Sequence, residues 1–305
     1  MTWFALSILS AIFTSFVSII DKIVVERHLR DHWSFPLFTS AFLGIYAVAL
    51  VSVRASLGLF RLPPAPILAV GLLPGILQYL ASVLYTRALL RTDAATVAAI
   101  NQTAPLFSVV WGWAVFGEVF GPLGYLGVIL SVVCCAGLTW ERTPHAGRTL
   151  NPVLFITVAG AMVRSLGDLF VKVTLTSQDY WNTFGLSRMA LLPITLLLLL
   201  NRDQRLLVGH AIRLNGPRLL PAMAALELLA VVPLVLSTVA YARGPLALVS
   251  AVRYTTPLFV LLLTVLLNGL RAGLVPDQAA AGSPLRRAGL TAGILAGVLM
   301  LRVKA

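Results

Sequence analysis

Charged residues are scarce in this chain of 305 residues. Asp, Glu, Lys and Arg make up 11% of it, whereas a soluble domain carries about a quarter. Hydrophobic residues make up 59% of the chain, and the mean hydropathy is +0.92. This composition argues against a water-soluble enzyme of two ordinary domains and favours a chain that lies in a lipid bilayer.

Cysteine and histidine are also few. The two cysteines, Cys134 and Cys135, are neighbours in an apolar run, so we interpret both as small core residues rather than a disulfide framework. The four histidines all fall in predicted loops: His28, His32, His145 and His210. We therefore expect neither a metal site nor a cofactor.

Ten apolar segments follow one another, separated by short connectors. They cover residues 3–23, 34–53, 66–88, 94–116, 121–140, 152–175, 182–200, 218–241, 245–268 and 287–303. Each can cross about 30 Å of hydrocarbon as an α-helix, and runs such as Leu196–Leu200 lack the alternation of barrel strands. We interpret the first segment as a retained helix rather than a signal peptide. The sequence predicts an all-α membrane protein with ten transmembrane helices.

The chain repeats itself at about half its length. After a shift of 152 residues, Thr86–Phe107 aligns without gaps with Thr238–Phe259, and ten of the 22 positions are identical. A shift of 150 pairs three further residues of the first helix with the sixth: Ala11 with Ala161, Ser15 with Ser165, and Lys22 with Lys172. We predict two five-helix repeats, residues 1–148 and 149–305, in one integral membrane domain. Because five is odd, the second repeat is inverted, as in many secondary transporters.

A distinctive pattern follows Pro105. It consists of Trp113, then Phe116-Gly117-Glu118, then Gly121, Gly124 and Gly127. With the ten helices, the two repeats and the Pro105/Pro257 pair, it resembles the EamA-like families of the drug/metabolite transporter superfamily over nearly the whole chain. The second half departs from the pattern, since Asn268-Gly269-Leu270 stands where Gly-Glu would be. The resemblance implies a gradient-driven exporter or exchanger, and we expect it in a bacterial inner membrane; the fold does not give the substrate.

One predicted helix carries three charged residues on one face. Arg164, Asp168 and Lys172 follow one another at four-residue spacing, and each charge costs at least ~2.5 kcal/mol at membrane depth. We expect Arg164 and Asp168 to bind substrate in a polar stripe. The alternative is a self-neutralising ladder in which Asp168 pairs with Arg164 or Lys172. Lys22 and Lys172 are expected to extend towards a membrane face.

Each repeated proline follows a polar pair by one turn. Asn101-Gln102 precede Pro105, and Arg253-Tyr254 precede Pro257. A proline leaves a carbonyl unpaired one turn back and loosens the helix. We therefore predict a helix kink at each proline, with the four polar side chains lining a substrate cavity. The alternative is interhelical hydrogen bonding that only locks the packing.

Other polar residues at membrane depth are candidates for the same path. Gln78 and Tyr85 share a helix face, and Ser15 lies in the first helix; we expect all three to bind substrate, with packing as the alternative. Glu227 is the first candidate for proton coupling and Asp168 the second. The alternative for Glu227 is a fixed ion pair with Arg253 or Arg188.

A row of glycines marks the last helix. Gly289, Gly293 and Gly297 recur at four-residue spacing, which lets another helix approach closely. We interpret this face as the contact between the fifth and tenth helices. Homodimerisation is the weaker alternative, so the protein is expected to be a monomer or a homodimer.

The net charge of +12 resolves into two groups. Eighteen of the 23 Lys and Arg residues lie scattered in connectors or at the C-terminus, which leaves no basic face for nucleic acid. Their distribution places the termini outside, whereas the family resemblance places them inside. At depth, Arg164, Lys172, Arg188 and Arg253 outnumber Asp168 and Glu227, and this surplus favours a substrate with a carboxylate or a phosphate.

The sequence therefore predicts a secondary active transporter. It would export or exchange a small metabolite by alternating access. One alternative is a flippase of a phosphate-bearing lipid, which would take a lipid-linked substrate. A membrane-embedded enzyme is the other, and the lack of a clustered catalytic array such as DxxD argues against it.

Overall fold

Every regular element that the structure describes is a helix. The computed structural model describes residues 2–28, 34–89, 94–139, 150–216, 219–270 and 284–302, and these contain no strand. In chain order the helices are α1 (Trp3–His28), α2 (Ser34–Ser56), α3 (Ala65–Leu89), α4 (Ala94–Asn101), α5 (Ala104–Phe116), α6 (Pro122–Thr139), α7 (Leu150–Thr174), α8 (Tyr180–Met189), α9 (Leu191–Leu199), α10 (Arg202–Asn215), α11 (Leu219–Arg243), α12 (Leu246–Arg253), α13 (Thr256–Leu270) and α14 (Pro284–Arg302).

Within the described ranges, seven helical stretches are long and apolar enough to cross a membrane. They are Trp3–Asp21, Ser34–Ser56, Ala65–Ala88, Leu154–Thr174, Tyr180–Leu199, Leu219–Arg243 and Leu246–Leu267. Three further apolar helices are shorter: Ala104–Phe116, Pro122–Gly137 and Ala288–Leu301. Large apolar side chains such as Phe155 and Leu197 are 76% and 66% exposed, as expected for side chains that face lipid. The predicted all-α membrane fold is confirmed, whereas the number of ten transmembrane helices stays a prediction.

Three of the predicted helices are broken: 182–200 is divided into α8 and α9, and the other two are each broken in the same way. The break between α4 and α5 and the break between α12 and α13 lie 152 residues apart, the same shift as the sequence repeat. At each break a threonine hydroxyl, that of Thr103 or Thr255, donates to the carbonyl three residues back at 2.7 Å. Pro105 and Pro257 are each the second residue of the new helix. A proline has no amide hydrogen for the carbonyl four residues back, so the helix is interrupted there.

The connector 201–217 was expected to be a polar loop, but it contains α10. The side chain of Asn201 caps this helix by accepting from the amide of Asp203 at 2.9 Å. Ala211 packs in a cluster with Phe38 of α2 and Met223 of α11. His210 therefore lies on a helix rather than in a loop. The expectation was wrong because a short amphipathic helix contains enough charge to look like a connector.

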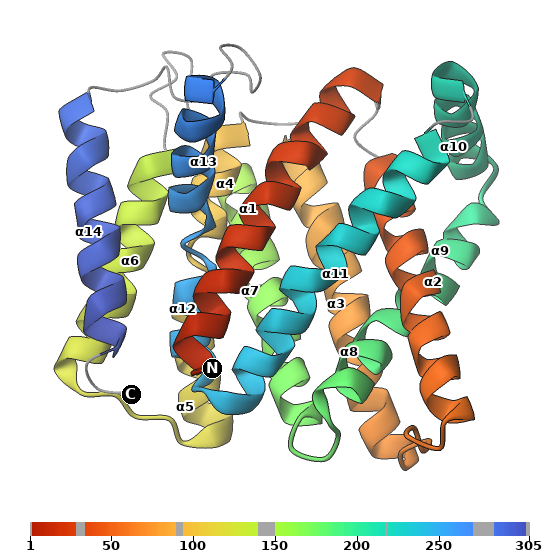
Figure 1. The fold of residues 1–305 in the computed structure, drawn as a ribbon, viewed down its shortest axis with the longest axis horizontal. Helices are drawn as coiled ribbons and strands as arrows, with labels where there is room; N and C mark the ends of the chain where they lie inside the picture. The colour runs from red at the N-terminus through yellow and green to blue at the C-terminus, as the bar shows by residue number, and fades with distance from the viewer. Residues whose placement is uncertain are drawn as a thin grey trace.

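Three helix pairs make the most extensive contacts: α3 with α7, α1 with α11, and α6 with α14 (Figure 1). The backbones of α6 and α14 come close together. A Cβ atom added at Gly297 would lie only 2.9 Å from the carbonyl oxygen of Gly127. A Cβ at Gly293 would meet Cys134 of α6, whereas one at Gly289 would meet nothing within 4 Å. The predicted contact between these helices is confirmed at Gly293 and Gly297.

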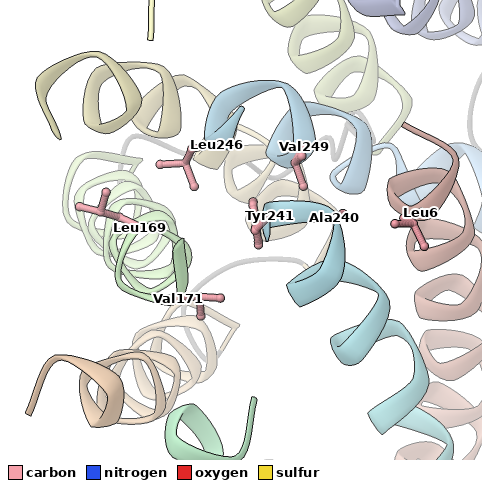
Figure 2. Packing of buried hydrophobic residues seen from close by; sticks show 7 residues of the cluster. All are labelled: Leu6, Leu169, Val171, Ala240, Tyr241, Leu246 and Val249. Carbon is pink, nitrogen blue, oxygen red and sulfur yellow. The ribbon is translucent and has the colours of Figure 1, made fainter. Parts of the chain in front are cut away.

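One apolar core cluster contains buried residues from four helices, including α12, which ends at the break before α13. Its buried members are Leu6 of α1, Leu169 and Val171 of α7, Ala240 and Tyr241 of α11, and Leu246 and Val249 of α12. Figure 2 shows Tyr241 between the side chains of α7 and those of α12. This packing fixes where the end of α12 lies relative to α7 and α11.

Candidate functional site

Arg253, the last residue of α12, is the centre of a polar cluster. Its Nη1 donates to Asp168 Oδ1 of α7 at 3.2 Å and to the hydroxyl of Tyr241 of α11 at 2.6 Å. Its guanidinium carbon lies 5.2 Å from the centre of the Tyr241 ring. The Tyr241 ring lies in the apolar core and its hydroxyl in the polar cluster, as the amphipathic tyrosine side chain allows. At the break after α12, Arg253 therefore joins α12 to α7 through an ion pair and to α11 through a hydrogen bond.

Two more arginines and two more tyrosines lie within electrostatic range of this pair or of one another. The charges of Asp168, Arg253 and Arg164 all act on Arg188 of α8, and the same three charges act on Tyr254. Arg164 also acts on Tyr85 of α3. We call this group the central cluster: Tyr85, Arg164, Asp168, Arg188, Tyr241, Arg253 and Tyr254.

The structure brings five of the predicted binding residues together in the central cluster and adds two. Tyr85, Arg164, Asp168, Arg253 and Tyr254 were expected from the sequence, whereas Arg188 was expected only as a charge at membrane depth. Tyr241 was missed. Its place beside Arg253 depends on the turn between α11 and α12, which a search for charges inside apolar segments does not detect.

Several buried polar atoms here have no partner among the described residues. In the central cluster they are Oδ2 of Asp168 and Nε of Arg188; Oε1 of Gln102, at the first break, also lacks a partner. A buried polar atom without a hydrogen bond costs about 1–3 kcal/mol, so such atoms are retained where a function requires them or a ligand satisfies them. The central cluster therefore has hydrogen-bonding capacity left over for a bound group.

The ion pairs of α7 reach other segments rather than one another. Asp168 pairs with Arg253, and Lys172 pairs with Glu118 in the connector before α6. The alternative of a self-neutralising ladder, in which Asp168 pairs with Arg164 or Lys172, is therefore wrong. Lys172 lies in the last turn of α7, but its side chain is only 16% exposed because it pairs with Glu118; the side chain of Lys22 lies outside the described residues.

The Lys172–Glu118 pair is part of a larger contact. The ammonium group of Lys172 also donates to the carbonyl of Gly244 at 3.0 Å and lies 4.8 Å from the centre of the Phe116 ring. Glu118 Oε1 also accepts from the amide of Leu246, the first residue of α12, at 2.8 Å. The sequence marks Glu118 only as part of a family pattern, and no role was predicted for it.

A second cluster, separate from the first, contains two carboxylates, Asp21 of α1 and Glu227 of α11. Thr39 Oγ1 of α2 donates to Glu227 Oε1 at 2.7 Å, and the charge of Glu227 acts on Asp21 and on Tyr46. We call Asp21, Thr39, Tyr46 and Glu227 the carboxylate cluster. A fixed pair of Glu227 with Arg253 is wrong, because Arg253 pairs with Asp168.

The remaining predicted residues are distributed around the breaks. Ser15 Oγ of α1 donates to the carbonyl of Thr256, the first residue of α13, at 3.1 Å. Gln78 and Asn101 are half-buried, and the described contacts do not link either to the central cluster. Among the described residues, no group of three or more His, Cys, Asp and Glu could hold a metal ion.

Comparison with known families finds a match for the first part of the chain. The sequence model of the EamA-like transporter family matches residues 1–140. Residues 1–140 are similar to this family. The predicted resemblance is therefore confirmed over these residues, and the family that matches is one of membrane transporters. The matched residues include Pro105 and Glu118, whereas the residues of the central cluster other than Tyr85 lie beyond them.

Solved structures extend the likeness to the whole fold. One, titled only "Crystal structure of protein", has a TM-score of 0.65 and 17% sequence identity, and the match covers 96% of each chain. At this identity the likeness shows the fold alone. No curated protein matches the chain.

Proposed function

We propose that the protein is a secondary active transporter of a bacterial inner membrane, an exporter or exchanger that moves a small metabolite with a carboxylate or phosphate group. The observation that carries the proposal is the central cluster, in which three arginines, Arg164, Arg188 and Arg253, accompany one acid, Asp168, that pairs with Arg253. Guanidinium groups bind carboxylates and phosphates through paired hydrogen bonds. Such a cluster, placed at a break in a membrane helix, suits an anion that crosses the membrane without contact with lipid.

The proposed architecture is ten transmembrane segments in two inverted repeats. Ten segments result when the seven long stretches and the three shorter apolar helices all cross the membrane. Under the repeat, α1 corresponds to α7 and α3 to α11, so the α3–α7 and α1–α11 contacts are counterparts. The two breaks, 152 residues apart, are counterparts as well. Such internal symmetry supports a mechanism in which two halves exchange conformations.

The proposed mechanism is alternating access, and contacts at one face support it. The Lys172–Glu118 pair joins the two proposed repeats at the end of α7, and the pair of Arg54 with Asp179, 2.7 Å apart, joins them at the end of α2. Both pairs lie on the side where α1 begins (Figure 1). Opening the path on this side would break both, so we interpret the structure as closed at this face.

Proton coupling is proposed for the carboxylate cluster. Glu227 is buried, with 3% of its surface exposed, and its described partner is the neutral hydroxyl of Thr39. It lies 14 residues before Tyr241 on α11, which is about 21 Å along the helix axis. A carboxyl group so placed can bind a proton without contact to the substrate anion.

A stability screen across classes of solute tests the proposed function. Ligands that bind the folded protein raise its melting temperature, so carboxylates and phosphates should raise that of the purified protein, whereas neutral and cationic metabolites should not. Arg253→Gln should abolish the rise. Equal stabilisation by neutral or cationic solutes, or no effect of Arg253→Gln, would count against the proposal. Stabilisation by anionic phospholipids alone would indicate a lipid flippase instead.

A further inference from the structure

The central cluster carries more positive charge than its own acid neutralises. Its three arginines, Arg164, Arg188 and Arg253, remain protonated in proteins, and Asp168 is the one acid of the cluster among the described residues. Only Arg253 has an ion-pair partner there. The described cluster therefore carries a surplus of two positive charges, centred on Arg164 and Arg188.

Neighbouring groups do not remove this surplus. Lys172, one turn beyond Asp168, is neutralised by Glu118. The carboxylate cluster lies about 21 Å away along α11, and Glu227 is not among the charges that act on Arg188 or Tyr254. The helix ends at the break bring the negative end of α12 next to the positive end of α13, so their partial charges nearly cancel.

We propose that the group bound at this site carries two negative charges, as a phosphate monoester or a dicarboxylate does at neutral pH. The proposal rests on the proposed transport function and deepens it by naming the charge of the substrate. An uncompensated charge inside a membrane is costly, and a dianion neutralises both unpaired arginines where a monoanion leaves one. The buried Nε of Arg188, which has no partner among the described residues, is a donor available to such a group.

Matched pairs of probes test the charge requirement on the full-length protein in detergent. Methyl phosphate is compared with dimethyl phosphate, and succinate with monomethyl succinate, by calorimetry at pH 7.5. A phosphate monoester is mostly a dianion there, because its second pKa is about 6. Each dianion should bind at least tenfold more tightly than its singly charged ester, a difference of about 1.4 kcal/mol.

The variants separate charge from shape, since each ester also carries an extra methyl group. Arg188→Gln lowers the surplus to one charge and should reduce the preference for the dianion at least fivefold, whereas Arg188→Lys should keep it. Arg164→Gln is a second, independent test with the same expected loss. A preference unchanged in both glutamine variants would show that shape, and not charge, decides, and would overturn the inference.

The outcomes also separate this inference from the proposed function. Monoanions that bind as tightly as dianions would overturn the charge requirement and leave transport of an anion standing. No binding by any of the four anionic probes at millimolar concentration would overturn both.

Discussion

Glu118 and Lys172 form an ion pair that joins the connector between α5 and α6 to the last turn of α7. The same carboxylate accepts from the amide of Leu246, where α12 begins. Seven residues later α12 ends at Arg253, in the central cluster. The pair therefore fixes the outer end of the short helix whose inner end carries the main binding arginine.

Glu118→Gln should destabilise the protein strongly. The change removes the negative charge and leaves the largely buried ammonium group of Lys172 without a counterion, and breaking such a pair costs about 3 kcal/mol. Thermal unfolding of the purified variant measures the effect. The control is Asp203→Asn, the same chemical change at an exposed position of α10, which should shift the melting temperature little.

A double variant checks that the cost comes from the unpaired ammonium group. Lys172→Met in the Glu118→Gln background should recover part of the stability, because the uncompensated charge is then removed. If the double variant is as unstable as the sum of the two single variants, the pair does not act as a unit.

Two glycines of one helix should respond to alanine in opposite ways. At Gly297 the added Cβ would lie 2.9 Å from the carbonyl of Gly127, so α6 and α14 must separate, at a cost of about 1–3 kcal/mol. At Gly289 the Cβ meets nothing, and alanine should add up to about 1 kcal/mol through its helix propensity. Melting temperatures of both variants, measured side by side, test this; a similar loss in both would contradict the described contact.

Substitutions of Asp179 should show that its capping of α8 contributes more to the free energy of unfolding than its ion pair with Arg54. Its Oδ1 accepts from the amide of Asn182 at 2.9 Å and so caps α8, while its Oδ2 pairs with Arg54. Asp179→Asn keeps a good capping residue and should cost under about 1 kcal/mol, since the pair is partly exposed. Asp179→Ala should cost about 1 kcal/mol more. Chemical unfolding curves compare the two, and the reverse order would refute the assignment.

Glu227→Gln should separate transport from the proton gradient. If Glu227 carries the coupled proton, the variant should still exchange labelled for unlabelled substrate across liposome membranes. It should lose accumulation driven by a pH gradient. Thr39→Val is the matched control, because it removes the hydrogen bond to Glu227 but keeps the carboxyl group. Gradient-driven accumulation by Glu227→Gln would exclude this residue as the coupling site.

Much of the fold could be predicted because long apolar runs leave few alternatives. The predicted segment 34–53 became α2, Ser34–Ser56, and the repeat shift of 152 also separates the two breaks. The helix α10 could not be predicted in the same way, since its charges resemble those of a connector.

The candidate site was only partly predictable for a different reason. Helical spacing places Arg164, Asp168 and Lys172 on one face, but it cannot show which other segments face them. The partner of Asp168 is Arg253, which lies 85 residues away in sequence. That of Lys172 is Glu118, 54 residues away. Such pairings depend on tertiary packing, which a single sequence does not encode in any local pattern.

The central claim is that Arg253 binds a substrate anion in a transporter, and uptake into proteoliposomes tests it most directly. Wild-type protein and Arg253→Gln, reconstituted in equal amounts, are compared for uptake of the labelled anion that most stabilises the wild type. The account predicts saturable uptake by the wild type and a loss of at least tenfold in the variant, with Arg286→Gln, at the exposed start of α14, retaining it. Equal uptake by wild type and Arg253→Gln would contradict it.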